Sequence, residues 1–256
     1  MAATGVDVVG DIAIVRLPAL GLSERRKFAK EMMAEVANVR AVYEQKGAVT
    51  GEFRLRKLIH LAGERRTSTI HRENGCVYRV DVARCYFSPR LSTERLHVAN
   101  AVSGGERVLN MFAGVGPFSI LIAKRRKARV TSCEVNKLAA NLHAENNRLN
   151  RVEGLVDVVK ADVAEWGSST RLRFDRVLMP HPSASLEFLP TSIRLARKGA
   201  AVHYYRHVLG RDEAEAEEKV RSELAGRLPA GARHEIRKVR EVGPRWLEMV
   251  AEIRLA

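Results

Sequence analysis

The feature that most constrains the fold is a regular alternation of strand-like and helix-like segments beyond residue 100. Five apolar runs are predicted to be strands: Arg107–Met111, Arg129–Glu134, Val156–Val159, Arg173–Met179 and Ala200–Tyr205. Helical patterns follow four of them, at Phe118–Lys124, Lys137–Leu149, Ser185–Ala196 and Asp212–Leu228. Strands that alternate with helices form a parallel sheet with both faces covered, so the sequence predicts a Rossmann-like α/β domain.

The last part of the chain returns to strand-like patterns. His234–Val239 and Leu247–Ile253 are predicted to be an antiparallel strand pair, which is a common decoration at the edge of a parallel sheet.

The first ninety residues have a different organisation. Two strand pairs are predicted around turns at Gly10-Asp11 and Asn74-Gly75: Val6–Val9 with Ile12–Leu17, and Ser68–Arg72 with Cys76–Val82. A helix with Ser23 as its N-cap is expected to run to about Val39, followed by a strand at Arg40–Tyr43. We therefore expect a small α+β domain over residues 1–90 and the α/β domain over residues 91–256, with a helix near Thr93–Val102 at its start.

The charge of the chain points to a polyanionic partner. Lys and Arg number 44 against 30 Asp and Glu, which gives a formal net charge of +14. Basic side chains that neutralise phosphates release counterions and so add affinity for nucleic acid. An excess of charged residues is also typical of proteins from hot habitats, and the two explanations are compatible.

Other classes of protein find little support in the sequence. The N-terminal residues lack the basic and apolar regions of a secretory signal, and no apolar stretch is long enough to span a membrane, so a cytoplasmic protein is expected. Cys76, Cys85 and Cys133 form no CxxC pair and have no His at metal-ligand spacing. We expect free thiols and no metal site.

The turn after the first predicted parallel strand carries the strongest site signal. Residues Asn110 to Gly116 read Asn-Met-Phe-Ala-Gly-Val-Gly and lead directly into a helix. Glycines at such a turn allow close approach of a ligand, and the helix N-terminus presents unpaired N–H groups. A third Gly, which a dinucleotide fingerprint requires, is absent, since Pro117, Phe118 and Ser119 follow.

Two acidic residues follow the next strands in order. Glu134 lies twenty residues after Gly114, where a carboxylate suits a ribose diol, and Asp162 follows the third strand, where it can accept from an adenine amine. Either acid alone would be read as a solvated loop carboxylate, but the three signals in strand order favour a nucleoside-type cofactor. The missing third Gly favours S-adenosyl-L-methionine over NAD.

Three motifs closely resemble those of the archaeal and eukaryotic tRNA guanine-37 N1-methyltransferases. They are the run from Met111 to Ser119, the run from Tyr86 to Arg95 (Tyr-Phe-Ser-Pro-Arg-Leu-Ser-Thr-Glu-Arg), and the run from His71 to Gly75. The resemblance covers nearly the whole chain. It implies a Rossmann-like class I methyltransferase sheet with a small N-terminal α+β domain, and methyl transfer to N1 of guanosine 37 in the anticodon loop of tRNA by a monomer.

The resemblance also implies roles for individual residues. Glu94 matches a general base for the guanine N1 proton, Arg54 in the run Glu52–Arg56 matches an arginine that holds the base edge, and Tyr86 matches a tyrosine beside cofactor and base. The predicted cofactor-binding residues are Phe87, Asn110, Phe112, Ala113, Gly114, Val115, Gly116, Glu134, Val135, Asp162 and Val163. The predicted substrate-binding residues are Pro180, His181 and Pro182. Taken singly, Glu94, Arg54 and Tyr86 would be read as a helix-start carboxylate, a surface charge and a core aromatic.

The sequence departs from the family pattern in two places. Pro180 stands where the family usually has an Asn whose amide contacts the target base, and His181 is either its substitute or an ordinary loop histidine. Many members begin with an extra N-terminal domain that grips the tRNA corner, whereas this sequence is expected to start at the domain that follows it; either the protein lacks the extra domain or the sequence has been trimmed.

Three alternatives remain open on the sequence. One is the wyosine-pathway aminocarboxypropyltransferase, which uses the same cofactor but transfers a different arm of the sulfonium. Another is a wyosine-precursor C-methyltransferase acting on a tricyclic base. The third is a non-catalytic RNA-binding module, which Pro180 would permit, although Gly114, Gly116, Glu134 and Asp162 favour a cofactor-binding enzyme.

Overall fold

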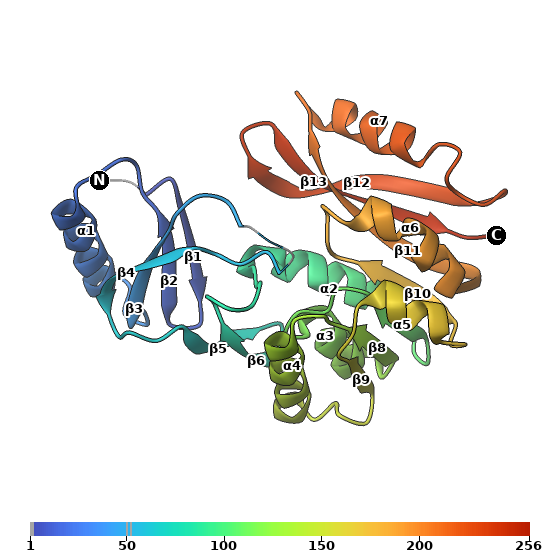
Figure 1. Ribbon diagram of the computed structural model, residues 1–256, viewed down its shortest axis with the longest axis horizontal. Helices are drawn as coiled ribbons and strands as arrows, with labels where there is room; N and C mark the ends of the chain where they lie inside the picture. The colour runs from blue at the N-terminus through green and yellow to red at the C-terminus, as the bar shows by residue number, and fades with distance from the viewer. Residues whose placement is uncertain (1–2, 50, 52) are drawn as a thin grey trace.

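The computed structural model describes residues 3–49, 51 and 53–256, so Glu52 of the run Glu52–Arg56 lies outside the described residues. Figure 1 shows an N-terminal unit beside a larger unit that contains the rest of the chain. The larger unit is a mixed α/β fold with a mostly parallel central sheet, as the sequence predicts.

The N-terminal unit is a four-stranded sheet with one helix against it. The strands lie in the order β1-β2-β3-β4: β1 (Gly5–Val9), β2 (Ile12–Arg16), β3 (Ala41–Gln45) and β4 (Leu58–Gly63). The β1–β2 hairpin turns at Gly10-Asp11 as predicted, and β2 pairs parallel to β3. Strand β4 was not predicted from the sequence, and it is held by antiparallel pairing with β3.

Helix α1 (Leu22–Glu35) packs on β3 and β4 and begins earlier than expected. Gly21 is the N-cap, and the Glu24 carboxylate accepts a hydrogen bond from the Gly21 amide at 2.9 Å. The prediction of Ser23 as the N-cap is therefore wrong, because Glu24 satisfies the amide of Gly21, two residues earlier.

A two-stranded hairpin, β5 (Ser68–Glu73) and β6 (Cys76–Asp81), lies between the two sheets in the chain. Its turn has left-handed φ values at Asn74 and Gly75, as the Asn-Gly signal predicts. The hairpin packs against a helix of the larger unit, where the Asn146 side chain bonds both the amide and the carbonyl of Arg79 at 2.7 and 3.1 Å. The same side chain donates to the Val115 carbonyl at 3.0 Å. Asn146 therefore ties the hairpin to the glycine-bearing turn.

The larger unit contains a seven-stranded sheet in the order β12-β13-β11-β10-β7-β8-β9. The strands are β7 (Arg107–Asn110), β8 (Arg129–Cys133), β9 (Val156–Val159), β10 (Phe174–Met179), β11 (Ala196–Leu209), β12 (Arg233–Gly243) and β13 (Trp246–Arg254). The five neighbouring strands from β11 to the edge strand β9 run parallel, and the predicted antiparallel pair β12–β13 forms the opposite edge. The chain reverses its direction of strand addition between β7 and β10, where doubly wound sheets bind ligands.

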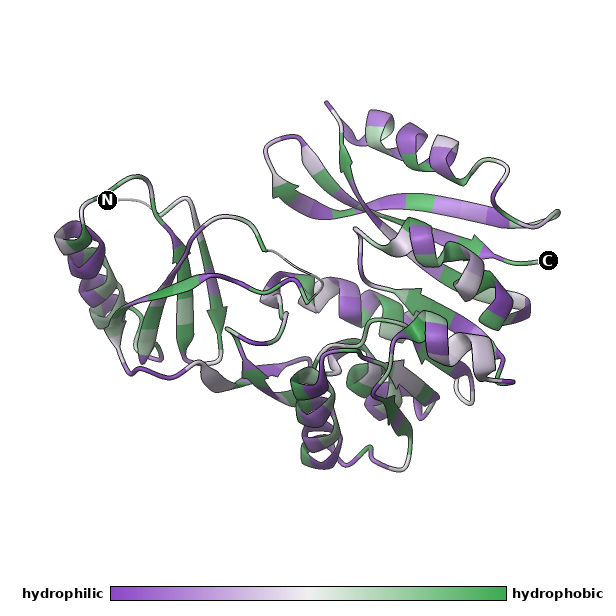
Figure 2. Ribbon diagram, viewed as in Figure 1, coloured by the Kyte–Doolittle hydropathy of each residue, from purple (hydrophilic) through white to green (hydrophobic). Residues whose placement is uncertain are grey.

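Helices cover both faces of this sheet, as Figures 1 and 2 show. They are α2 (Ser92–Ala101) after the 3₁₀ turn Pro89–Leu91, α3 (Pro117–Arg126), α4 (Lys137–Asn150), α5 (Val163–Ser169), α6 (Ser185–Leu195) and α7 (Glu213–Leu224). Adjacent strand residues pack into different cores, with Val108 in one cluster and Leu109 in the other. Burial on both faces explains the continuous apolar runs in the sequence.

One helix of the larger unit was not predicted, and several elements differ from their predicted extent; helix α7, for example, ends at Leu224 instead of Leu228. Helix α5 was not predicted because it is short and contains Gly167. Strand β11 continues to Leu209 instead of ending at Tyr205, because its last residues pair with β13. No helix in the described ranges is long and apolar enough to cross a bilayer.

Candidate active site

The glycine-bearing turn after β7 is shaped for close approach. Gly114 and Gly116 have φ values of 56° and 92°, which glycine adopts without strain. A Cβ atom on Gly116 would lie 2.2 Å from a ring carbon of His143 in α4, so no larger residue fits there. Pro117 then begins α3, where the lack of an N–H costs nothing.

Glu134 follows β8 and is bonded to this turn. Its carboxylate accepts hydrogen bonds from the Gly114 amide at 2.6 Å and from the Asn136 amide at 2.8 Å. Each carboxylate oxygen has more than one acceptor site, so the group retains capacity for a ligand hydroxyl. The two residues that the sequence linked by spacing are therefore in direct contact.

Asp162 follows β9 and caps helix α5. Its Oδ1 atom accepts from the amides of Ala164 and Glu165 at 2.7 and 3.3 Å. This capping role was not foreseen, since α5 itself was not predicted. Asp162 nevertheless lines the same cavity as Glu134.

A cavity of about 360 Å³ lies at the carboxyl ends of β7, β8, β9 and β10. Its walls include ten predicted site residues: Arg54, Tyr86, Phe112, Gly114, Glu134, Val135, Asp162, Val163, Pro180 and His181. The cavity therefore brings together the two predicted acidic residues, Glu134 and Asp162, with Arg54, Tyr86 and His181.

The remaining predicted cofactor and substrate residues do not belong to the described wall of this cavity. They are Phe87, Asn110, Ala113, Val115, Gly116 and Pro182. Asn110 is fully buried and donates to Ser119 Oγ at 3.1 Å, which braces the turn from behind. Phe87 and Val115 are buried core residues, and the Pro182 carbonyl accepts from Arg206 at 3.1 Å. These positions support the site through backbone geometry and packing.

Other wall residues were missed by sequence reasoning: Phe53, Met111, Asn136, Ala139, Ala161, Ala184, Glu187 and Phe188. Asn136 could have been found, because it directly follows Glu134 and Val135 and is a typical helix N-cap. Glu187 and Phe188 carry no motif, and they reach the cavity only because α6 packs beside β10.

Arg54 and Tyr86 form a stacked pair between the two units. The Arg54 guanidinium carbon lies 4.6 Å from the centroid of the Tyr86 ring, within cation–π range. Arg54 has a φ of 52°, an uncommon value for a residue with a side chain. The stack leaves a planar cation at the cavity wall, where it can meet the edge of a base.

His181 follows β10 and packs against an aromatic pair. Its ring lies 5.1 Å from that of Phe112, which in turn makes a perpendicular contact with Phe188 at 5.1 Å. The His181 Nδ1 atom accepts from the Ala184 amide at 3.2 Å, which places the proton of the neutral ring on Nε2. His181 is therefore oriented by the loop that carries it.

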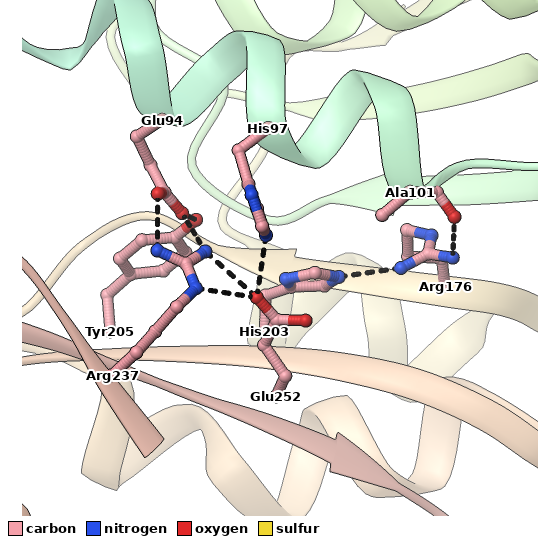
Figure 3. Close-up of polar contacts among 8 residues, drawn as sticks. All are labelled: Glu94, His97, Ala101, Arg176, His203, Tyr205, Arg237 and Glu252. Atoms are coloured by element: carbon pink, nitrogen blue, oxygen red, sulfur yellow. Dashed lines mark hydrogen bonds and ion pairs between the residues drawn. The ribbon is translucent and has the colours of Figure 1, made fainter. Parts of the chain in front are cut away.

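Glu94 is buried away from the described cavity wall. It lies in the first turn of α2 and is 5% exposed. Its carboxylate accepts from both terminal nitrogens of Arg237 at 2.8 and 2.9 Å and from the Tyr205 hydroxyl at 2.6 Å (Figure 3). Burial and the nearby Glu94 hold the pKa of Tyr205 well above its usual value, so the phenol stays a donor. Neither partner of Glu94 was predicted from the sequence.

A second, more open cavity of about 760 Å³ adjoins the first and shares Arg54, Tyr86 and His181 with it. Its walls come from both units and contain a group of basic residues: Arg16, Lys46, Arg54, Arg56, Arg90, His207 and Arg240. Asp7 of β1 also lines this cavity and pairs with Arg90 at 2.6 Å, and Arg56, which pairs with Asp7 at 3.0 Å, donates to the Phe87 carbonyl at 3.1 Å. The two units are thus joined at this wall. Basic residues outnumber the acidic wall residues Asp7, Glu44 and Glu241, so the groove suits a polyanion.

The chain as a whole resembles known proteins. Residues 69–227, most of the chain, match the model of the TRM5/TYW2 methyltransferase domain. The chain belongs to the TRM5/TYW2 family. Residues 3–67 match the TYW2 N-terminal domain, so the family model begins where the β5–β6 hairpin begins.

Individual TRM5/TYW2 relatives resemble the chain to different extents. It is 42% identical over 206 residues to the tRNA (guanine(37)-N(1))-methyltransferase Trm5b of Pyrococcus abyssi. That match covers 79% of this chain, and the chain spans only 59% of the length of Trm5b. It is 29% identical over 260 residues to the tRNA 4-demethylwyosine(37)-methyltransferase Taw21 of Saccharolobus solfataricus, with 97% of this chain and 93% of Taw21 covered.

The family fold is equally clear in three dimensions. The solved complex of aTrm5 and tRNALeu superposes with a TM-score of 0.88 at 32% identity, over 99% of this chain and 72% of that one. The division of the chain at residue 90 and the roles of the site residues stay predictions.

Proposed function

We propose that the chain is an S-adenosyl-L-methionine-dependent tRNA methyltransferase that acts on N1 of guanosine 37. The observation that carries the proposal is the cavity that joins the glycine turn and Glu134 to the stacked Arg54–Tyr86 pair and opens into a basic groove. A family match over residues 69–227 and the relatives named Trm5b support the reaction class.

The residues present fit the proposed cofactor. Glu134 would accept from the ribose hydroxyls, and Asp162 would accept from the adenine amine beside the backbone of Ala161 and Val163. Phe112 and Phe188 offer apolar contact in the same wall. When bound, S-adenosyl-L-methionine supplies an electrophilic methyl group on a sulfonium. The solved relatives with adenosine, MeSAdo and AdoMet support this choice of ligand.

The target base is proposed to enter between Arg54 and His181. A guanidinium gives planar, two-point contact to a base edge and balances negative charge that develops on the carbonyl oxygen. Pro180 lacks the side-chain amide of the Asn that the family usually has at its position. The Nε2 proton of the neighbouring His181 is proposed to serve as the donor in its place. Tyr86 fixes the plane of Arg54 from the other side.

Removal of the N1 proton is assigned to Glu94. Guanine N1 is a poor nucleophile until its proton has left, and a carboxylate is a suitable acceptor. The Glu94 carboxylate must turn away from Arg237 and Tyr205 to reach the cavity, because both donors hold it below the surface.

The RNA itself is proposed to lie along the second cavity, with the anticodon loop at Arg54. The basic side chains of that groove can meet phosphates on either side of the target nucleotide. We propose further that the enzyme acts as a monomer in the cytoplasm.

The proposal is tested by mass spectrometry of nucleosides from tRNA transcripts after incubation with the protein and cofactor. Production of 1-methylguanosine at position 37 is the expected result, and a transcript with adenosine at position 37 is the control. Parallel incubations with methyl-labelled and carboxyl-labelled cofactor identify the transferred arm. Retention of the carboxyl label on tRNA would instead identify an aminocarboxypropyltransferase.

A second candidate is methylation of 4-demethylwyosine at position 37. The end-to-end match with Taw21 and the loss of the family amide at Pro180 favour it, since a tricyclic base presents different edge groups from guanine. The same assay on tRNA that already carries 4-demethylwyosine separates the two candidates. Methylation of that tRNA without methylation of guanosine-37 transcripts would replace the first proposal by the second.

A further inference from the structure

The terminal hairpin β12–β13 holds both ends of the segment Tyr86–Glu94, which carries two of the three proposed catalytic residues. This hairpin begins at Arg233 and so lies outside the part of the chain that matches the family domain. Two arginines of β12 point from the hairpin toward the segment, and each is backed by a glutamate of β13.

The first bridge runs from Glu252 through Arg237 to Glu94. Arg237 Nε and Nη2 donate to one oxygen of Glu252 at 3.0 and 2.8 Å, while Nη1 and Nη2 donate to the two oxygens of Glu94 (Figure 3). Burial works against the charge, yet the two carboxylates raise the pKa of Arg237, so the guanidinium stays charged. A planar fork with five donors can serve two carboxylates at once.

The second bridge runs from Glu248 through Arg240 to the start of the segment. Arg240 Nε donates to Glu248 at 2.6 Å, and Nη1 donates to Ser88 Oγ at 3.2 Å. Burial works against this charge too, but Glu248 and the Tyr86 side chain, which interacts with the guanidinium, raise the pKa of Arg240. Glu248 is 3% exposed, and against the effect of burial its interactions with His207 and Arg240 hold its pKa below the usual value.

We propose that Arg237 and Arg240 are positioning residues of the active site, Arg237 holding the Glu94 carboxylate at the end of the segment from which it turns toward the substrate, and Arg240 holding Tyr86 and Ser88 at the start. The proposal rests on the proposed function for the roles of Glu94 and Tyr86. Glu252 retains Arg237 when the Glu94 carboxylate turns toward the substrate.

The test compares Arg237→Met and Arg240→Met with Arg233→Met, an exposed arginine on the same strand. Each of the first two is expected to lower kcat about 10²-fold, as misplacement of catalytic groups does, while the Kd of the cofactor changes less than about twofold. The KM of tRNA should also stay within about twofold for Arg237→Met, whereas Arg240 lines the basic groove and its loss is expected to raise the KM as well. The control should stay within about twofold of wild type in all three quantities. A rise in kcat for Arg237→Met would overturn the proposal, because it would mean that Arg237 only sequesters Glu94.

Glu252→Gln keeps the test decisive if Arg237→Met does not fold. The Glu252 side chain is 31% exposed, so its substitution is expected to disturb folding less than the loss of Arg237, and about a tenfold fall in kcat is expected. The double variant Glu252→Gln with Arg237→Lys should lose less than the product of the effects of Glu252→Gln and Arg237→Lys measured singly, since both act through one bridge. Independent, multiplicative effects would contradict a shared route.

A measurement that does not depend on activity distinguishes failure of the positioning proposal from failure of the proposed function. If the wild type methylates none of the tRNA substrates, amide hydrogen exchange over Tyr86–Glu94 decides the positioning proposal by itself. Faster exchange in Arg237→Met and Arg240→Met than in Arg233→Met is then expected, and unchanged exchange in both would overturn it.

Discussion

The Gly114 amide donates to the Glu134 carboxylate at 2.6 Å, so the turn after β7 and the residue after β8 form one unit. The bond fixes the direction of the carboxylate before any ligand arrives. It also makes the conformation of the turn depend on the acid that is proposed to bind the ribose.

Substitution Glu134→Ala is expected to weaken S-adenosyl-L-methionine binding. The loss should be on the order of 1–3 kcal/mol, because ligand hydroxyls and the Gly114 amide would lose their acceptor. Calorimetric titration measures it, and thermal unfolding serves to verify that the turn remains folded. Unchanged affinity would exclude Glu134 as the ribose acceptor.

Substitution Glu94→Gln should abolish most turnover while leaving both ligands bound. Removal of a general base typically lowers the rate about 10²–10⁴-fold, and Gln can still accept from Tyr205 but cannot take a proton at working pH. Single-turnover kinetics at saturating tRNA give the rate. Higher pH should partly restore it, since hydroxide can then remove the guanine proton. Full turnover at neutral pH would return Glu94 to a purely structural role.

Substitution Arg54→Lys separates charge from geometry. Lys keeps the positive charge but loses the plane that stacks on Tyr86 and meets a base edge. We expect a large fall in kcat, and Arg16→Lys in the same basic groove is a matched control with little effect. A small effect at both positions would mean that Arg54 acts as a point charge.

Binding of tRNA should weaken steeply with salt. Proteins that contact several phosphates lose about 10³-fold or more in affinity between 50 and 200 mM salt. Fluorescence anisotropy with labelled tRNA measures the slope, and cofactor affinity over the same range provides the control. A flat dependence would show that the +14 charge is unrelated to the substrate.

Stability should fall between pH 7 and pH 5 because of two buried histidines. Burial lowers the pKa of His143 to about 3, and burial together with the nearby Arg176 lowers that of His203 to about 3. Between pH 6.5 and 3 the unfolded chain therefore binds protons that the folded protein does not, so stability decreases as pH falls. The loss at pH 5 is about 2 kcal/mol per histidine.

Denaturant titrations at both pH values measure this loss. His143→Gln should show a smaller pH dependence than the wild type, since one of the two groups no longer titrates. Equal pH dependence in variant and wild type would assign the effect to other groups.

The parallel sheet and the glycine turn could be predicted from the sequence because their signals are local. An apolar run, a glycine pair and an acid at fixed spacing each reflect a constraint within a few residues of Gly114 or Glu134. The Asn74-Gly75 hairpin is of the same kind. Strand β4 and helix α5 were not predicted, because their own sequence patterns are weak. Strand β4 is stabilised by pairing with β3, and helix α5 by the Asp162 cap.

The partners of the proposed catalytic residues could not be predicted. Arg237 meets Glu94 across a separation of 143 residues, and the contact exists only because β13 lies between β11 and β12. The sequence around Arg237 does not distinguish it from the exposed Arg233 on the same strand. Strand order, which creates the contact, is a property of the whole sheet.

The hydrogen bonds of Asn146 imply that ligands bound at two separate places on the protein affect each other's binding. Its side-chain amide bonds the Val115 carbonyl in the glycine turn and both the backbone amide and the backbone carbonyl of Arg79 in the β5–β6 hairpin. Any ligand that stiffens the turn therefore also stiffens the hairpin, and any partner that displaces the hairpin alters the turn. Such coupling is reciprocal by thermodynamic necessity, so a macromolecule held at the hairpin and a small molecule held at the turn should each change the affinity for the other by the same factor.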